Sequence, residues 1–460
     1  KELLPIVEKI KAEYSALSAL SHDELRAKTD VFRKRILTYL EPTEAEIKAL
    51  TDELESQPNM PLQQKEDRYG RIDKLKAELN QKIEEVLQEI QPAAFAVVKE
   101  AARRLKENES IRVTASDHDR ALAATKANVI IDGDHAIWKN SWIAAGNTVI
   151  LKPAEWSPLS CSMLADLCHA AGMPPGVFNV VQGIGEEVGA ALVSDPRLKR
   201  ISFTGSPETA RHIGVAAARN IVPFTAELGG KGPFVVFADA DLDAAAKKAA
   251  GQYDDSGQVC LAGTRLLVEA SVRDEFLERF HRSADAHVLG DSRQDGTTIS
   301  PMIHPEHASR VAGFVDRARA AGDTILRGGR RSDLGGDDGL WYEPTLIEPR
   351  SNDSEVVQHE IFGPVLTFQT FADEAEAIAL ANSTAYGLSA IVYTGSAERA
   401  ERMGRAVRAG TVWTNCFLVR DLTAPFGGCG ISGIGREGGD YALDFYSDLK
   451  MFQVLDGTTR

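Results

Sequence analysis

The sequence predicts an α/β protein in which Rossmann-type parallel sheets begin near residue 147 and follow a mainly helical N-terminal segment. Glycine supports this division, because only Gly70 and Gly133 of the 38 glycines precede residue 141. Cysteine supports it too, since all five cysteines lie after that residue. Long helices avoid glycine, whereas tight turns between strands and helices need it. The composition therefore predicts different architectures on the two sides of the stretch SWIAAGNTVILKP.

The N-terminal segment is predicted to form long helices. Ser21 and Glu24 in SHDEL have the spacing of a capping box ahead of an apolar-periodic run. Further along, six apolar residues recur every three or four positions, as one face of a helix requires. They are Ile72, Leu75, Leu79, Ile83, Val86 and Ile90. Pro92 interrupts this pattern.

Two further stretches of the N-terminal segment have local interpretations. KLKAELNQKIEEVLQEI is a solvated helix packed on its neighbours or a dedicated partner site, and we favour the packed helix. NVIIDGDHAIW places Asp132 and Gly133 between apolar runs, a pattern typical of a β-hairpin.

Beyond residue 147 the pattern becomes strand, glycine turn and helix. The expected strands lie in NTVILKP, VFNVVQG, RISFTGS and GPFVVFAD, and SPETARHIGVAAAR is an expected helix. This alternation indicates a parallel sheet covered by helices, and such sheets bind ligands at the carboxyl ends of their strands.

The glycine-rich stretch GIGEEVG could indicate which ligand the sheet binds. Gly183, Gly185 and Gly189 form G-x-G-x-x-x-G, whereas the strict dinucleotide fingerprint needs glycine at Val188. A dinucleotide-binding loop and a plain tight turn remain equally compatible with this stretch.

The bulk properties narrow the class of protein. A chain of 460 residues is long enough for two or three domains. A net charge of −15 argues against nucleic acid or an anionic membrane as the main partner. Apolar runs stay well short of the roughly 20 residues that a membrane helix needs. The N-terminal KELLPIVEKIKAEY lacks a signal-peptide pattern, and with five cysteines this predicts a cytoplasmic protein with free thiols.

ALSHDELRAKTDVFRKRI and PAAFAVVKEAARRLKENE resemble the N-terminal region of the preprotein translocase ATPase SecA, and the resemblance covers about residues 1–147. A phosphate-binding loop of the form G-x-x-x-x-G-K-[ST] does not occur in the sequence. We therefore expect this part not to be a translocase motor.

Four stretches in fixed order, FTAELGGKGPF, DDSGQVCLAGTR, QHEIFGPVL and APFGGCGISGIGREGG, resemble signature segments of the aldehyde dehydrogenase superfamily. The resemblance runs from about Asn147 to the C-terminus. It implies a four-part organisation. The expected parts are a helical segment (1–146), a partial NAD-binding domain (147–229), a catalytic domain (230–415) and a segment that completes cofactor and oligomerisation parts (416–460).

The resemblance assigns the chemistry to two residues. Cys260 would attack an aldehyde carbonyl, and the thiohemiacetal would become a thioester that water cleaves. A lone cysteine is by default buried and inert, but the flanking SGQV and AGTR favour the nucleophile. Glu227 would activate the hydrolytic water if burial raises its pKa, the alternative being a surface glutamate. Cys161 and Cys168 are expected to pack in a core, and Cys429 has no assigned role. We predict no metal site.

The resemblance also implies the residues that bind the cofactor. A carboxylate at the adenosine ribose accepts from its hydroxyls and repels a 2′-phosphate, which favours NAD over NADP. Gly205 and Ser206 stand where a helix should begin, a place suited to pyrophosphate. The expected set is Lys152 and Glu155 at the adenosine ribose, Gly185 and Gly189 in the glycine stretch, Gly205 and Ser206 at the pyrophosphate, and Glu360 and Phe362 at the nicotinamide ribose.

The substrate class follows from one further stretch. NCFLVRDLTAPFGG resembles the branch that oxidises hydroxymuconic and carboxymethyl-hydroxymuconic semialdehydes in aromatic catabolism. Arg420 would bind a substrate carboxylate, for which its planar fork is suited, and a surface salt bridge is the alternative.

In the aldehyde dehydrogenase family the cofactor domain begins well before the segment that corresponds to Asn147, where the resemblance starts in this chain. The missing front supplies sheet strands and a PWN segment whose asparagine donates to the oxyanion, and PWN does not occur in this chain. Loss of one such donor costs about 10²–10³ in kcat. We hypothesise a chimera joined at the shared AAGN. Three interpretations remain: an aldehyde dehydrogenase with a substituted front, a non-catalytic protein with a translocase-like interaction segment, and a chain without a functional fold.

Overall fold

The computed structural model describes residues 4–56, 61–108, 110–124, 129–139, 147–171, 173–448 and 451. The chain forms two compact units. The first unit contains residues 1–151 and 159–180, and the second contains residues 152–158 and 181–460. Among the helices of these described residues, none has the length and apolar composition needed to cross a bilayer.

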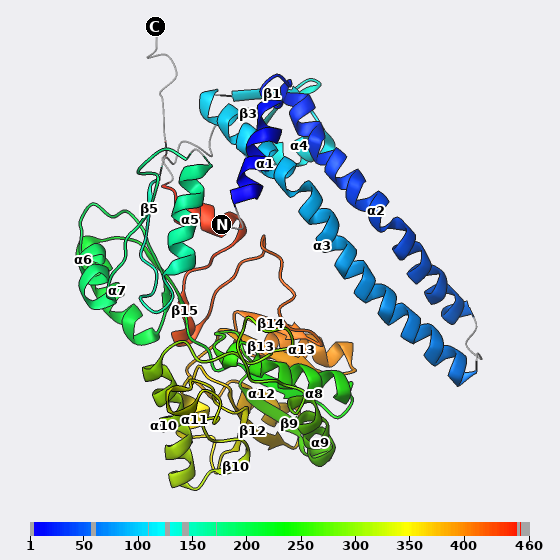
Figure 1. Cartoon of the computed structure of the whole chain (residues 1–460), viewed down its shortest axis with the longest axis vertical. Coiled ribbons are helices and arrows are strands. Elements are labelled where there is room, and N and C mark those ends of the chain that lie inside the picture. The colour runs from blue at the N-terminus through cyan, green and yellow to red at the C-terminus, as the bar shows by residue number, and fades with distance from the viewer. Residues whose placement is uncertain are drawn as a thin grey trace. The chain divides into compact units, whose positions relative to one another are not determined.

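The first unit is dominated by helices α1 (Leu4–Ser15), α2 (His22–Ser56) and α3 (Leu62–Glu107), of which α2 and α3 run side by side (Figure 1). The expected capping box is confirmed at the start of α2. The Ser21 backbone N–H donates to Glu24 Oε2 at 2.7 Å, and the Glu24 N–H donates to Ser21 Oγ at 3.2 Å. The predicted apolar face of α3 is buried or half-buried along its length. Local capping and periodicity therefore suffice to predict these helices.

The expectation that Pro92 interrupts the helix is wrong, because α3 continues through it to Glu107. A proline inside a helix costs about 3 kcal/mol through the lost hydrogen bond and a steric clash. Buried residues on both sides offset that cost. Val86, six residues before Pro92, is buried. Ala96, four residues after it, packs with Leu17 and Leu25.

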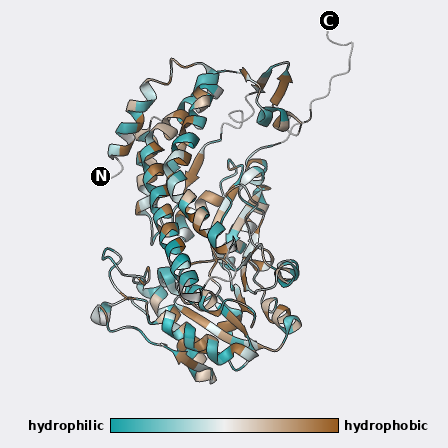
Figure 2. Ribbon diagram, turned by 90° about the vertical axis from the view of Figure 1, so that its right-hand side faces the viewer, coloured by the Kyte–Doolittle hydropathy of each residue, from teal (hydrophilic) through white to brown (hydrophobic). Residues whose placement is uncertain are grey.

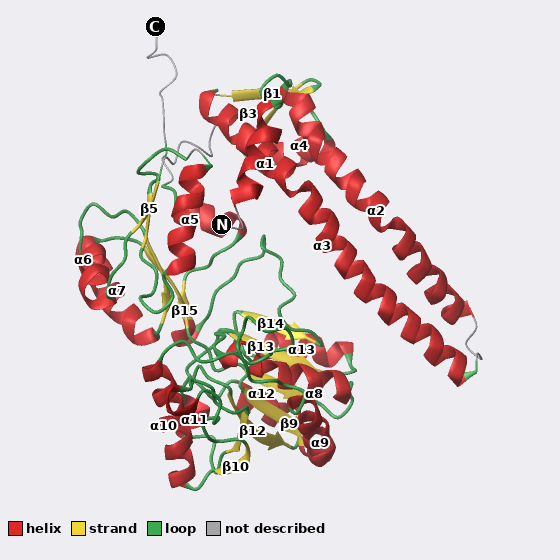
Figure 3. Cartoon of the chain, viewed as in Figure 1, coloured by secondary structure: helices red, strands yellow, loops and turns green. Residues whose placement is uncertain are grey.

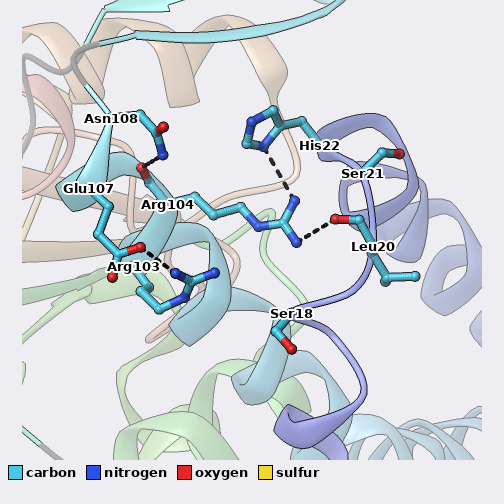
Figure 4. A pocket seen from close by; sticks show the side chains of 8 residues that line it. All are labelled: Ser18, Leu20, Ser21, His22, Arg103, Arg104, Glu107 and Asn108. Carbon is cyan, nitrogen blue, oxygen red and sulfur yellow. Dashed lines mark hydrogen bonds and ion pairs between the residues drawn. The ribbon is translucent and has the colours of Figure 1, made fainter.

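Charged residues near the end of α3 form a paired network beside a surface pocket (Figure 4). Glu100 is fully buried and accepts hydrogen bonds from Arg103 and Arg104. The Arg104 guanidinium also donates to the Leu20 carbonyl at 2.7 Å and contacts His22. Because these charges are satisfied within the protein, the network stabilises the helix junction rather than presenting a free binding group.

Two small sheets complete the first unit. The expected hairpin is confirmed, because Asp132 pairs with His135 across a tight turn in which Gly133 has φ +57°. The apolar helix α5 contributes no buried residue, so Cys161 and Cys168 are half-buried and the expectation of core packing is wrong. The elements are β1 (Ser110–Thr114), α4 (Asp117–Ala123), β2 (Val129–Asp132), β3 (His135–Lys139), β4 (Val149–Leu151), α5 (Leu159–Ala170) and β5 (Phe178–Val180), with the strands in order β1-β3-β2 and β4-β5.

A seven-stranded sheet forms the core of the second unit (Figure 3). Its order is β10-β11-β12-β9-β8-β13-β14, and all neighbouring strands are parallel except β10 and β11. The strands are β8 (Pro233–Val236), β9 (Arg265–Glu269), β10 (Thr324–Arg327), β11 (Thr345–Glu348), β12 (Val365–Phe371), β13 (Ser389–Tyr393) and β14 (Thr411–Thr414).

Helices cover both faces of this sheet. Successive side chains of a strand point to opposite faces, so Phe234 and Val236 pack with α8 and α9 while Val235 packs with α12 and α13. This explains why most residues of the central strands are hydrophobic (Figure 2). The helices are α8 (Leu242–Ala250), α9 (Arg273–Ala284), α10 (Pro305–Ala321), α11 (Glu355–Gln358), α12 (Glu374–Ala381) and α13 (Ala397–Ala406).

A smaller sheet with order β15-β7-β6 belongs to the same unit, and its β6 and β7 are parallel. Helix α7 packs on it through Ala210, beside Ala226 and Leu228. The expected strand–turn–helix order is thus confirmed. The elements are a π-helix (Gly185–Gly189), α6 (Ala190–Val193), β6 (Ile201–Gly205), α7 (Pro207–Asn220), β7 (Phe224–Leu228), β15 (Gly433–Ile434) and α14 (Gly439–Phe445).

Candidate active site

Loops that precede three neighbouring strands meet at one edge of the seven-stranded sheet. Gly229–Lys231 precede β8, Cys260 precedes β9, and Glu360–Phe362 precede β12. Because β12, β9 and β8 are adjacent and parallel, these loops share the amino-end edge. We expected ligand-binding residues at carboxyl ends, which is where β7 places Glu227. The chain runs from β7 through the glycines straight into β8, so the carboxyl end of one sheet meets the amino end of the other.

The Cys260 thiol lies in this loop cluster. It is half-buried and packs against the core of the seven-stranded sheet. Burial raises its pKa above the ordinary value, and the negative charges of Glu360 and Glu227 raise it further. The negative charge of each carboxylate therefore reaches the thiol. A thiol with a raised pKa needs a proton acceptor before it can act as a nucleophile.

Glu227 on β7 is placed to be such an acceptor. Its side chain is buried, and neither carboxylate oxygen has a hydrogen-bond partner among the residues that the structure describes. Burial and, to a lesser extent, the charge of Glu437 raise its pKa to about 7, and Arg436 opposes the shift. Buried carboxylates without partners are costly and rare outside functional sites. A pKa near neutrality suits transfer of a proton in either direction.

The Gly229–Gly230 pair allows the backbone to pass between Glu360 and Cys260. The Gly230 N–H donates to Glu360 Oε1 at 2.9 Å. A Cβ atom at Gly230 would lie 2.6 Å from the Cys260 carbonyl oxygen, and one at Gly229 would lie 1.9 Å from Glu360 Oε2. Only glycine fits such close approaches.

Replacement of Gly230 by alanine is expected to displace the Cys260 loop and to lower kcat/KM by about 10²-fold, the scale of a 1 Å misplacement of catalytic groups. Steady-state NADH formation, the activity that the resemblance implies, would measure the loss. Gly404→Ala is the matched control, because its added Cβ meets nothing within 4 Å on helix α13. Equal activity of the two variants would contradict this account.

Two residues of α10, which sequence reasoning did not identify, hold the Glu360–Phe362 loop in place. His307 Nε2 donates to the Phe362 carbonyl oxygen at 2.6 Å. Arg310 donates to the carbonyl oxygens of Ile361 at 2.6 Å and Glu360 at 2.8 Å. Phe362 itself has φ +61°, a strained value for a non-glycine residue. These hydrogen bonds hold the strained turn and thereby set the position of the Glu360 carboxylate.

The residues expected at the adenosine ribose lie together. Lys152 Nζ forms an ion pair with Glu155 Oε2 at 3.2 Å and lies near Gly189. Hydrogen bonds from its own backbone N–H and from Lys152 hold the pKa of the exposed Glu155 below its usual value. Trp156, the next residue, stacks on His304 with ring centroids 4.3 Å apart. The stack fixes the loop, and the ionised Glu155 remains open to accept hydrogen bonds from a diol.

The residues expected at the pyrophosphate also have suitable geometry. Gly205 ends β6, and Ser206 is the N-cap of α7, where its Oγ accepts from the Thr209 N–H at 3.1 Å. The exposed start of a 14-residue helix suits an anionic group. In the glycine stretch, a Cβ at Gly183 would lie 2.3 Å from Val188 Cγ2, whereas Gly185 faces open space. Together, the Lys152–Glu155 pair and the helix start at Gly205 and Ser206 fit the ribose and pyrophosphate of a dinucleotide.

Arg420 lies on the exposed loop between β14 and β15. Its guanidinium stands 4.7 Å over the Phe426 ring and has no carboxylate partner within the described residues. Phe426 is followed by Gly427, at which a Cβ would lie 2.8 Å from Glu227 Oε1. The alternative interpretation, a surface salt bridge, has no partner among the described residues. Arg420 belongs to the segment that packs on the candidate base.

Comparison with known proteins accounts for this arrangement. Residues 136–452 match the aldehyde dehydrogenase family model. This chain belongs to the aldehyde dehydrogenase family. The match begins before residue 147, where the motifs alone placed its start.

Individual relatives of the family agree with this assignment. The chloroplastic aminoaldehyde dehydrogenase of Arabidopsis thaliana is 42% identical over 317 residues, covering 68% of this chain and 63% of that protein. A betaine aldehyde dehydrogenase of Cereibacter sphaeroides is 40% identical over 321 residues, covering 69% and 66%. The γ-glutamyl-γ-aminobutyraldehyde dehydrogenase structure from Burkholderia cenocepacia superposes with a TM-score of 0.64 at 40% identity, covering 67% and 62%. An indole-3-acetaldehyde dehydrogenase complexed with NAD⁺ superposes equally well, with a TM-score of 0.64 at 39% identity, covering 66% and 62%. The chain thus spans just under two thirds of these relatives.

Proposed function

We propose that this chain oxidises an aldehyde to a carboxylic acid with NAD as the acceptor. The meeting of the Cys260 thiol and the Glu360 carboxylate, at the amino-end edge of the seven-stranded sheet, with the Glu227 carboxylate at the end of β7 carries the proposal. The NAD⁺ complexes among the structural relatives support the choice of cofactor. About a third of the length of those relatives has no counterpart in the match, so the activity must be tested on this chain itself.

The residues of this chain divide the proposed reaction between them. Glu227 takes the Cys260 proton, and the thiolate attacks the aldehyde carbon to form a thiohemiacetal. NAD, when bound, accepts the hydride that leaves this carbon, and a thioester remains on Cys260. Glu227 releases the thiol proton to solvent, and its carboxylate then accepts a proton from water as the water oxygen attacks the thioester. That second proton passes to the departing thiolate. Cleavage of the carbon–sulfur bond releases the carboxylic acid and restores the thiol.

The proposed cofactor contacts explain a preference for NAD. Glu155 accepts hydrogen bonds from the adenosine ribose, and its ionised carboxylate repels a 2′-phosphate. The pyrophosphate lies at Gly205 and Ser206, and Glu360 with Phe362 holds the nicotinamide ribose. Lys152, Gly185 and Gly189 complete the proposed set. Titration of the protein with NAD and with NADP by calorimetry tests this preference, and tighter binding of NADP would refute it.

We further propose that the substrate carries a carboxylate, as muconic-type semialdehydes do. The curated relatives are named for aminoaldehydes and betaine aldehyde, whose cationic groups Arg420 would repel. The guanidinium has no acidic partner among the described residues and is available for a carboxylate. This electrostatic argument favours a semialdehyde of aromatic catabolism over an aminoaldehyde.

Arg420→Ala is expected to raise KM for a muconic-type semialdehyde by about tenfold to 10²-fold, the scale of a lost charge-assisted hydrogen bond. The KM for a neutral aliphatic aldehyde should stay unchanged. Steady-state NADH formation with both aldehydes measures the difference. An equal change in the two KM values, or a wild-type preference for an aminoaldehyde, would count against the assignment.

The experiment that tests the function is NADH formation by the whole chain with a muconic-type semialdehyde. Turnover would establish that the site assembles in a chain without a PWN asparagine. If folded protein binds NAD but shows no turnover, only the proposed cofactor binding would remain supported. Absence of NAD binding would refute the dehydrogenase assignment altogether.

A second candidate is a non-catalytic chimeric protein whose helical part is a SecA-like interaction segment. The first unit favours it, because α1, α2 and α3 form a core and a buried ionic network of their own. The hypothesised junction WIAAGN lies mostly outside the described residues. The four-part division of the chain remains a proposal, as do a homo-oligomeric state and a cytoplasmic location. Amplification of the source DNA across codons 130–160 tests the junction. An uninterrupted product from genomic DNA would exclude an assembly error, and failure to obtain one would identify the junction as an artefact of assembly.

A further inference from the structure

Helix α10 begins at a residue that contacts a loop of the proposed cofactor site. Its N-cap is His304, whose Nδ1 accepts a hydrogen bond from the Glu306 N–H at 3.3 Å. The same imidazole stacks on the Trp156 indole, with ring centroids 4.3 Å apart and ring planes 5° from parallel. Both side chains belong to the second unit. Because Trp156 directly follows Glu155, the stack attaches the proposed adenosine-ribose loop to the start of α10.

The next two turns of the same helix hold the proposed nicotinamide-ribose loop. His307 and Arg310 donate hydrogen bonds of 2.6 to 2.8 Å to backbone carbonyl oxygens of the Glu360–Phe362 loop. Since each residue advances a helix by about 1.5 Å, His304 and Arg310 are separated by roughly 9 Å along the axis. One short stretch of helix therefore carries a contact to each of the two ribose-binding loops.

Packing makes this stretch of helix a firm support. Val311 on α10 and Ile361 in the Glu360–Phe362 loop are buried in one hydrophobic cluster. Immediately before the helix, the Ile303 N–H donates at 3.1 Å to the Oε1 of Gln258, which precedes Cys260 by two positions. Close-packed interiors resist small displacements. The start of α10 is therefore fixed against the Glu360–Phe362 loop and the Cys260 loop, and the adenosine-ribose loop is attached to it through the stack.

We propose that His304 is a positioning residue whose stack with Trp156 keeps the two ribose-binding loops at the separation that one dinucleotide needs. The imidazole acts through Trp156 and the helix and does not touch the dinucleotide. The inference rests on the proposed function, in which Glu155 binds the adenosine ribose and Glu360 the nicotinamide ribose. A ligand held at two places gains affinity from the second contact only when the distance between them matches its own length, and a rigid support raises that gain.

This role predicts different effects on the binding of NAD and of AMP, which carries the adenosine half alone. AMP needs only the loop that contains Glu155 and can follow that loop when the stack is lost. NAD must reach both loops, so it loses the advantage of their fixed separation. We expect loss of the stack to weaken NAD binding by about tenfold and AMP binding by less than about threefold. A contribution confined to the adenosine-ribose loop would instead weaken both ligands by the same factor.

Two substitutions separate the stack from the helix cap. His304→Phe keeps an aromatic ring but removes the Nδ1 acceptor, whereas His304→Asn keeps a capping side chain but removes the ring. The proposal predicts near wild-type affinity for NAD in His304→Phe and the tenfold loss in His304→Asn. If His304 served only as the cap of α10, the order of the two variants would be reversed, and the inference would be overturned.

The experiment is calorimetric titration of the whole chain with NAD, followed by AMP in competition with NAD. Trp156→Leu removes the same stack from its other side and replaces His304→Asn should that variant not fold. Combined, the two substitutions should weaken NAD binding little more than either alone, because both remove one contact. Wild-type affinity for NAD in His304→Asn would overturn the inference, as would equal losses for NAD and AMP. A wild-type chain that does not bind NAD would instead overturn the proposed function.

Discussion

Replacement of Cys260 by alanine is expected to abolish NADH formation while leaving the affinity for NAD unchanged. Loss of a covalent nucleophile lowers kcat by on the order of 10⁵-fold or more, because the chemistry has no other route through a thiohemiacetal. The variant should fold normally, since Cys260 is half-buried and alanine removes only the sulfur atom.

The measurement is steady-state NADH formation with a muconic-type semialdehyde, accompanied by a calorimetric NAD titration. Cys161→Ala serves as the matched control, because that thiol is also half-buried but lies on α5 in the other unit. Residual turnover above a few per cent in Cys260→Ala would assign the nucleophile elsewhere. Equal losses in both variants would point to a defect of folding.

Replacement of Glu227 by glutamine is expected to lower kcat by about 10²–10⁴-fold, the usual contribution of a general base. The pH profile carries the sharper prediction. Burial raises the pKa of Glu227 to about 7, and only the ionised form accepts a proton. The kcat of the unmodified chain should therefore rise as the pH increases through about 7, and this rise should be lost in the glutamine variant.

Glu437→Gln is a matched control for the pH profile. The Glu437 charge raises the pKa of Glu227, so its removal should lower that pKa and move the rise in kcat to lower pH. Stopped-flow measurements would separate the two steps that need the base. A rapid burst of NADH in Glu227→Gln places the defect in thioester hydrolysis, and absence of a burst places it in attack by the thiol. An unaltered pH profile in both variants would exclude Glu227 as the base.

Local patterns predicted most elements because their causes are local. The Ser21–Glu24 capping box and the Asp132–Gly133 turn depend on neighbours within a few residues, and both are confirmed. Pro92 shows where this fails. The free-energy cost of Pro92 inside α3 is offset by packing against side chains of other helices. The residues that flank Pro92 in the sequence do not reveal that packing.

By itself the sequence determined the family, the alternation of strands and helices after residue 147, and the residues expected in the site, because each lies in a motif of fixed spacing. The tertiary structure alone decided how those residues meet. Cys260 and Glu360 come together because they precede neighbouring parallel strands, and pairing order is a property of the whole sheet. The role of Arg310 likewise arises from hydrogen bonds to the Glu360 loop, a segment distant in sequence.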